Sequence, residues 1–175
     1  GETGIDCGGP CSYLCSVQET PPIVLFTGLI HNATGRTDLI AEVENKNSDA
    51  AARNVPFTVS LYGAGQSLIR EFASTLDLPP RAKVPVFIPG IALGGQTVAH
   101  AFLEIASTSP KWFTLTTDSR VVPVTSHTTL GGTPSAPRIE AVLTNPSVSI
   151  MNNVHIIVLI HGTNGNVIAA SETLV

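Results

Sequence analysis

The sequence predicts an all-β protein in which two tandem β-sandwich domains follow a short cysteine-rich segment. Three observations support this fold class. Apolar and polar residues alternate along short segments that end in turn residues, one strand pattern recurs along the chain, and all three cysteines lie within the first 15 residues. No segment carries a convincing helical period, and residues 49–52 would hold at most one helical turn.

The composition of this 175-residue chain excludes several classes of protein. Charged residues make up only 13% of the chain, and the net charge of −4 comes without any block of Lys or Arg. Because binding to nucleic acid needs clustered cations, we expect no nucleic-acid partner. No apolar stretch approaches the roughly 20 residues that span a bilayer, so we expect no membrane insertion by this chain.

The cysteine-rich segment, residues 1–20, contains Cys7, Cys11 and Cys15 with the spacing C-x3-C-x3-C. Disulfides would stabilise a segment too small to form its own core, and they indicate an oxidising compartment. A metal site is the alternative, but it more typically uses CxxC pairs with a His partner, and the segment has neither. We predict that at least two of the three cysteines are disulfide-bonded. The third would be a thiol, or its partner would lie upstream of Gly1 or on another chain.

The first predicted domain, residues 21–117, is a series of short strands separated by turn residues. Its clearest strand covers residues 55–62, where side chains alternate as in a half-buried strand. The core set is Val55, Phe57, Val59 and Leu61, and the opposite set is Pro56, Thr58, Ser60 and Tyr62. Gly63-Ala64-Gly65 then suits a hairpin turn. Further strands are expected over residues 39–44, 68–72, 84–88 and 97–105.

An internal repeat predicts the second domain, residues 118–175. Asn54-Val55-x-Phe57-x-Val59-x-Leu61-x-Gly63 recurs as Asn153-Val154-x-Ile156-x-Val158-x-Ile160-x-Gly162, at an offset of 99 residues. The segments that begin at Leu39 and Leu68 recur in the same order, at offsets of 100 and 99 residues. A period of about 100 residues is the size of one immunoglobulin-like domain, so we predict two tandem immunoglobulin-like sandwiches, the second apparently incomplete.

Two resemblances connect these patterns to bacterial surface proteins. The run from Gly1 to Cys11 resembles the end of a short motif of secreted bacterial proteins, in which a Cys-Asp-Gly-x-x-Asn run precedes E-T-x-x-D-C-G-G-x-C. The repeated unit resembles the small immunoglobulin-like modules of bacterial surface proteins, including a family named for its F-x-L-Y-D signature. Phe57 stands two residues too early for that signature, and Gly63 replaces its Asp. Both resemblances imply an extracellular or cell-surface location.

The sequence carries no catalytic motif, so we predict that the protein is not an enzyme and has no cofactor and no metal. It has no G-x-S-x-G, H-E-x-x-H, P-loop or G-x-G-x-x-G motif. His155 and His161 would lie about 20 Å apart along a strand, too far to share one ion. Glu2 and Asp6 could ligate calcium only with the help of upstream residues. Asn32-Ala33-Thr34 is a formal N-glycosylation acceptor, without meaning if the source is bacterial.

A glycan is a further partner that the sequence suggests. Trp112 lies in the run Ser109-Pro110-Lys111-Trp112-Phe113. As an exposed ring it could stack on a sugar, although such an aromatic residue more often packs under a linker or between domains.

The second domain carries the predicted interface on the outer face of its repeated strand. Its residues are His155, Ile157, Leu159 and His161. Two large aliphatic side chains, Ile157 and Leu159, stand where the first domain has Thr58 and Ser60. Because a strand that is apolar on both faces must be covered on both, we expect this face to pack against another domain or subunit.

The sequence stops soon after this strand, and this suggests how the protein assembles. Seven residues follow Ile168, so the second sandwich would lack about two strands. One explanation is that the polypeptide continues, and another is that a neighbouring subunit donates a strand, for which residues 21–30 would be the donor. A third, strained alternative is a compact second domain with only four strands. Repeated strand addition would build a filament. We therefore expect an extracellular structural or adhesive surface protein that associates with itself or with neighbouring surface domains. The alternative function is a carbohydrate- or protein-binding module.

Overall fold

The computed structural model describes residues 7–9, 11–32, 35–91, 97–106, 110–115, 120–133 and 135–175. Over these ranges the protein is all-β, which confirms the predicted class. A single turn of 3-10 helix, η1 (Ser16–Gln18), precedes eleven strands in the described ranges. They are β1 (Ile23–His31), β2 (Thr37–Glu44), β3 (Ala50–Tyr62), β4 (Leu68–Leu78), β5 (Lys83–Ile88), β6 (His100–Glu104), β7 (Trp112–Thr114), β8 (Val124–Thr133), β9 (Ala136–Thr144), β10 (His155–His161) and β11 (Val167–Leu174).

The chain divides into two compact units. The first consists of Gly1–Asp118 with Ile157–Ser171, and the second of Ser119–Ile156 with Glu172–Val175. Strands β1 to β7 all belong to the first unit. The predicted boundary between residues 117 and 118 stays a prediction.

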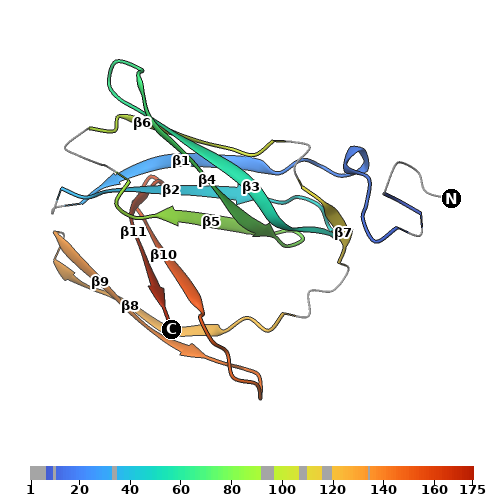
Figure 1. Ribbon diagram of the computed structural model, residues 1–175. Coiled ribbons are helices and arrows are strands. Elements are labelled where there is room, and N and C mark those ends of the chain that lie inside the picture. The colour runs from blue at the N-terminus through green and yellow to red at the C-terminus, as the bar shows by residue number, and fades with distance from the viewer. Residues whose placement is uncertain are drawn as a thin grey trace. The chain divides into compact units, whose positions relative to one another are not determined.

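The first sheet of the sandwich has the strand order β1-β2-β5, and all its pairs are antiparallel. Figure 1 shows the three strands side by side. The register places Ala41 of β2 between Thr27 of β1 and Val86 of β5. Of residues 21–30, expected as a donor strand for another subunit, residues 23–30 lie in β1 of this sheet. Val24 and Leu29 of β1 pack against the core of the same sandwich, which explains that placement.

The second sheet is built on β3, the longest strand, with β4 along one edge. Strands β6 and β7 both pair with β3 along its other edge, since Ala52 has Leu78 of β4 on one side and Trp112 of β7 on the other. β6 covers the second half of β3 and β7 its first residues, so the two short strands continue one another along β3.

The core lies between these two sheets, and the alternation predicted from the sequence fills it. Val55, Phe57, Val59 and Leu61 are buried, whereas Pro56 is exposed and Thr58, Ser60 and Tyr62 are partly exposed. The opposite sheet contributes Leu39, Ala41, Val43 and Val86. Full burial of a side chain of this size contributes about 1.5–3 kcal/mol to stability, so this set is the main source of the fold's stability.

A buried amide links the ends of the two sheets. The Asn45 side chain follows β2 and is fully buried. Its Nδ2 donates to the carbonyl oxygens of Ala50 at 2.9 Å and Pro79 at 2.8 Å, while its Oδ1 accepts from the backbone N–H of Asn47 at 3.0 Å. The Asn45 amide therefore bonds to backbone groups at the start of β3 and after β4, and both of its polar atoms have partners in the buried site.

The remaining strands form two hairpins. Within the described residues, β8 pairs with β9 and β10 pairs with β11, each in a two-stranded sheet. The first four strands show the same pairing of consecutive strands, since β1 pairs with β2 and β3 pairs with β4. The register of β8–β9 shifts between Ser126 and Thr129, near its first pairs, and β1–β2 shifts at the corresponding place, between Val24 and Phe26.

Candidate functional site

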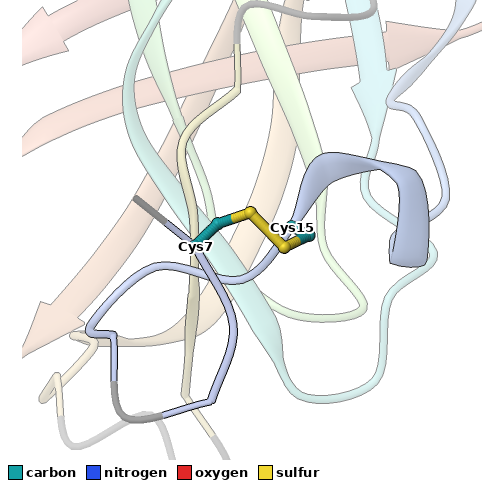
Figure 2. Close-up of a disulfide and its surroundings, with 2 residues drawn as sticks. All are labelled: Cys7 and Cys15. Carbon is teal, nitrogen blue, oxygen red and sulfur yellow. A yellow bond between two sulfur atoms is a disulfide. The ribbon is translucent and has the colours of Figure 1, made fainter. Parts of the chain in front are cut away.

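A disulfide between Cys7 and Cys15 holds the N-terminal segment, which confirms the predicted cross-link (Figure 2). The two Cα atoms lie 4.9 Å apart. Cys11 stands outside this bond and is partly exposed. The backbone supports the loop, because the N–H of Gly8 donates to the carbonyl of Tyr13 at 2.8 Å and the N–H of Cys11 donates to the carbonyl of Gly8 at 3.1 Å.

Hydrogen bonds also attach this segment to the sandwich. The N–H of Leu14 donates to the carbonyl oxygen of Trp112 in β7 at 2.8 Å. Farther along, Thr20 and the Asn47 side chain exchange two hydrogen bonds, of 2.8 and 2.9 Å. Cys15 is buried, and Leu14 packs against the core. The disulfide loop is therefore docked on the end of the sandwich where β7 lies.

An open depression of about 980 Å³ lies beside the disulfide loop. Three separate parts of the first unit line it: the disulfide loop, the first half of β3, and β7 with the residue before it. The lining residues are Cys11, Ser12, Tyr13, Arg53, Asn54, Pro56, Lys111, Phe113 and Thr114. This volume lies within the usual range for sites that hold small ligands.

The described residues that line the depression include two cations, Arg53 and Lys111, and no carboxylate. The guanidinium carbon of Arg53 lies 5.4 Å from the centre of the Phe113 ring, within the range of a cation–π contact. Lys111 is exposed next to Trp112, and Tyr13 is 46% exposed. The site therefore combines positive charge, aromatic surface and the polar side chains of Ser12, Asn54 and Thr114.

A β-bulge places Arg53 and Asn54 at this site. The pairing of β3 with β4 shifts register between Ala52 and Val55, and both residues inside the shift are exposed. In a regular strand, consecutive side chains point to opposite faces. Asn54 takes a left-handed backbone conformation with φ 50°, and its N–H donates to Asp77 Oδ1 at 2.9 Å. Bulges of this kind commonly redirect side chains beside functional sites.

A smaller pocket of about 410 Å³ lies at the other end of β3. Tyr62, Gln66, His100 and Phe102 line it. The rings of Tyr62 and Phe102 meet edge to face, with centroids 5.8 Å apart. Phe102 is 55% exposed, so this pocket is a second aromatic surface on the outer face of the second sheet.

The structure places the predicted interface residues on one strand, β10. His155 and His161 are exposed at its ends, and Ile157 and Leu159 between them are partly exposed. The ring Nδ1 of His161 lies 2.9 Å from the carbonyl oxygen of Gly165, a contact inside its own hairpin. The packing of this face against a partner stays a prediction.

The sequence also suggested sites for a sugar, for calcium and for glycosylation. The suggestion that an exposed Trp112 stacks on a sugar is wrong, because this side chain is 1% exposed and belongs to the core. Glu2 and Asp6, and residues 33 and 34 of the glycosylation motif, lie outside the described residues. Over the described ranges, no three His, Cys, Asp or Glu side chains form a cluster that could hold a metal ion.

Among the described residues, the carboxyl group of Glu19 has a shifted pKa. Partial burial raises the pKa of Glu19, and the negative charge of Asp49 raises it further. Glu19 lies beside Thr20, whose backbone bonds to Asn47, so it sits where the N-terminal segment joins the sandwich.

Comparison of the chain with family models, with curated proteins and with solved structures finds no match.

Proposed function

We propose that this chain is part of an extracellular structural or adhesive surface protein, whose sandwich modules act as spacers and as assembly units. The disulfide fits an oxidising compartment, and the docked loop continues directly into the sandwich. The repeated order of paired strands supports a modular array.

The observation that carries the assembly proposal is the pair of two-stranded sheets, β8–β9 and β10–β11. An isolated hairpin is only marginally stable in water, and its outer edges offer unpaired N–H and C=O groups to another strand. β10 is apolar on both faces, since Ile157 and Leu159 alternate with Ile156, Val158 and Ile160. Strand addition between copies would pair the N–H and C=O groups at the edges of the hairpins, and it would cover the second apolar face of β10.

A double substitution on β10 tests this proposal. Ile157→Thr together with Leu159→Ser gives β10 the residues that β3 has at the matching positions, Thr58 and Ser60. We expect the unmodified chain to form oligomers or polymers in electron micrographs and in light scattering, and the double variant to lose them.

The control changes apolar residues outside the strands. Val148 and Ile150 are 107% and 85% exposed, and Val148→Ser with Ile150→Thr lowers hydrophobicity by a similar amount in the loop before β10. The control should assemble like the unmodified chain. Uniform monomers of the unmodified chain would contradict the assembly proposal.

A binding module is the second candidate function. The depression beside the disulfide loop favours it, because that depression has the size of a ligand site and gathers side chains from three separate segments.

A further inference from the structure

We propose that the depression beside the disulfide loop binds an acidic saccharide, that is, a sugar that carries carboxylate groups. This inference goes beyond the structural role proposed above, and it does not depend on strand addition.

The charge of the site selects an anion. The chain has nine Lys and Arg residues and a net charge of −4, yet Arg53 and Lys111 both line this depression, and none of the described residues that line it is a carboxylate. Asp77, which accepts a hydrogen bond from the Asn54 backbone, is not one of the lining residues. A guanidinium is charged at every relevant pH and pairs with a carboxylate through two parallel hydrogen bonds.

The other lining groups suit a sugar ring next to that carboxylate. Tyr13 and Phe113 offer aromatic surface to the apolar C–H face of a pyranose, while Ser12, Asn54 and Thr114 offer donors and acceptors for its hydroxyl groups. A site that mixes aromatic surface with a few polar groups is the usual composition of a small-ligand pocket.

The backbone around the depression argues against an extended peptide as the ligand. Peptides that add to a sheet edge need unpaired backbone groups. Here β7 pairs with β3, the Trp112 carbonyl accepts from Leu14, and the Asn54 N–H is bonded to Asp77. A ligand at this site would therefore be bound by side chains and not by backbone groups.

Comparison of the repeated sequence positions shows which features of the site occur in the first unit but not in the second. Asn153 matches Asn54 in sequence position and also has a positive φ, of 56°, so the backbone feature belongs to the shared framework. Asn152 occupies the position of Arg53, so the charge does not recur. The positive site is thus a specific feature added to a common module.

Calorimetric titration of the whole chain at low ionic strength tests the inference. The probes are a short oligogalacturonide, a neutral galactose oligosaccharide of the same length, sodium acetate and an oligoglutamate peptide. We expect the oligogalacturonide to bind, the neutral sugar and acetate to bind far more weakly, and added salt to weaken binding. Equal binding of the neutral sugar would overturn the assignment of an anion site. Tighter binding of oligoglutamate would overturn the assignment of a saccharide.

Matched substitutions of basic residues test whether the ligand binds in this depression. Arg53→Gln should lower the affinity roughly tenfold, because it removes a charged hydrogen-bond donor, and Lys111→Gln should lower it less. Arg70→Gln is the control, since Arg70 is also exposed over a phenylalanine ring, Phe72 at 5.6 Å, but lies outside the depression. Unchanged affinity in both Arg53→Gln and Lys111→Gln, or an equal loss in Arg70→Gln, would refute the proposed location.

Discussion

Asn54 and Asn153 lie 99 residues apart and adopt nearly the same left-handed backbone conformation, with φ of 50° and 56°. Each residue comes directly before a valine that opens an alternating apolar pattern. Asparagine is one of the few residues other than glycine that tolerate this region. The repeat seen in the sequence is therefore also a repeat of backbone geometry.

The turns that follow these strands match as well. The N–H of Gly63 donates to Ser67 O at 3.0 Å, and the N–H of Gly162 donates to Asn166 O at 2.9 Å. Within these turns, Gln66 and Gly165 both have positive φ. Strand, turn and returning strand thus recur as one unit.

Replacement of Asn54 tests the importance of this backbone conformation. We expect Asn54→Val to lower the free energy of unfolding by about 1–2 kcal/mol, because a β-branched residue is strained at positive φ. Asn54→Gly should be close to neutral, since glycine adopts this conformation without strain. Chemical denaturation measures both variants. A valine variant as stable as the glycine variant would show that the left-handed conformation is not required.

The buried amide of Asn45 allows a comparison between matched positions. Asn45→Ala should cost about 2–4 kcal/mol, because it removes a fully buried side chain and its hydrogen bonds to the backbone of Ala50, Pro79 and Asn47. Asn145, at an offset of 100 residues, makes the same kind of turn but is exposed. Asn145→Ala should therefore cost less than about 1 kcal/mol. Similar losses in the two variants, measured by thermal unfolding, would contradict this account of Asn45.

Removal of the disulfide should release the N-terminal loop and leave the sandwich folded. The bond between Cys7 and Cys15 closes a short loop and should stabilise the ordered conformation of that segment by about 2.5 kcal/mol. In the double variant Cys7→Ser, Cys15→Ser, we expect the Leu14 N–H to exchange with solvent much faster, while the Val59 N–H in β3 stays protected. Cys11→Ser is the control and should leave the Leu14 N–H protected. Slow exchange at Leu14 in the double variant would show that the loop does not depend on the disulfide.

The raised pKa of Glu19 predicts a pH-dependent stability effect. A carboxyl whose pKa is higher in the folded protein favours folding in its protonated form, so its contribution is present in acid and is lost as pH rises through the folded-state pKa. At neutral pH the Glu19 charge therefore opposes folding. We expect Glu19→Gln to raise the unfolding temperature at neutral pH and to have less effect in acid. Val148→Ser, at a fully exposed loop residue, is the control and should show no such pH dependence. A lower unfolding temperature of the Glu19→Gln variant at neutral pH would contradict this account.

The sequence was sufficient to predict the strands of the core, because alternation with a period of two is a strong pattern where one face is buried. It misplaced Trp112, because this residue lies outside the strands that alternation predicts, so the pattern assigns its side chain to no face. The structure shows that Trp112 begins β7 and pairs with Ala52, which carries its ring into the core.

The depression could not be predicted because residues far apart in the chain form it. Tyr13, Arg53 and Phe113 meet only when the disulfide loop docks on the edge of β7. One local indication was present in the sequence. Arg53 and Asn54 interrupt the alternation between Ala52 and Val55, and two adjacent polar residues at such a point are typical of a bulge.

Hydrogen exchange of the backbone amides in β10 and β11, measured over a range of chain concentrations, tests the proposed assembly role most directly. If added strands complete these two-stranded sheets, protection of the edge amides will increase with concentration, together with the mass of the particle. The amides of β3, inside the first sandwich, serve as the internal reference and should show the same protection throughout. Protection of β10 and β11 that does not change with concentration, in a chain that stays monomeric, would contradict the account.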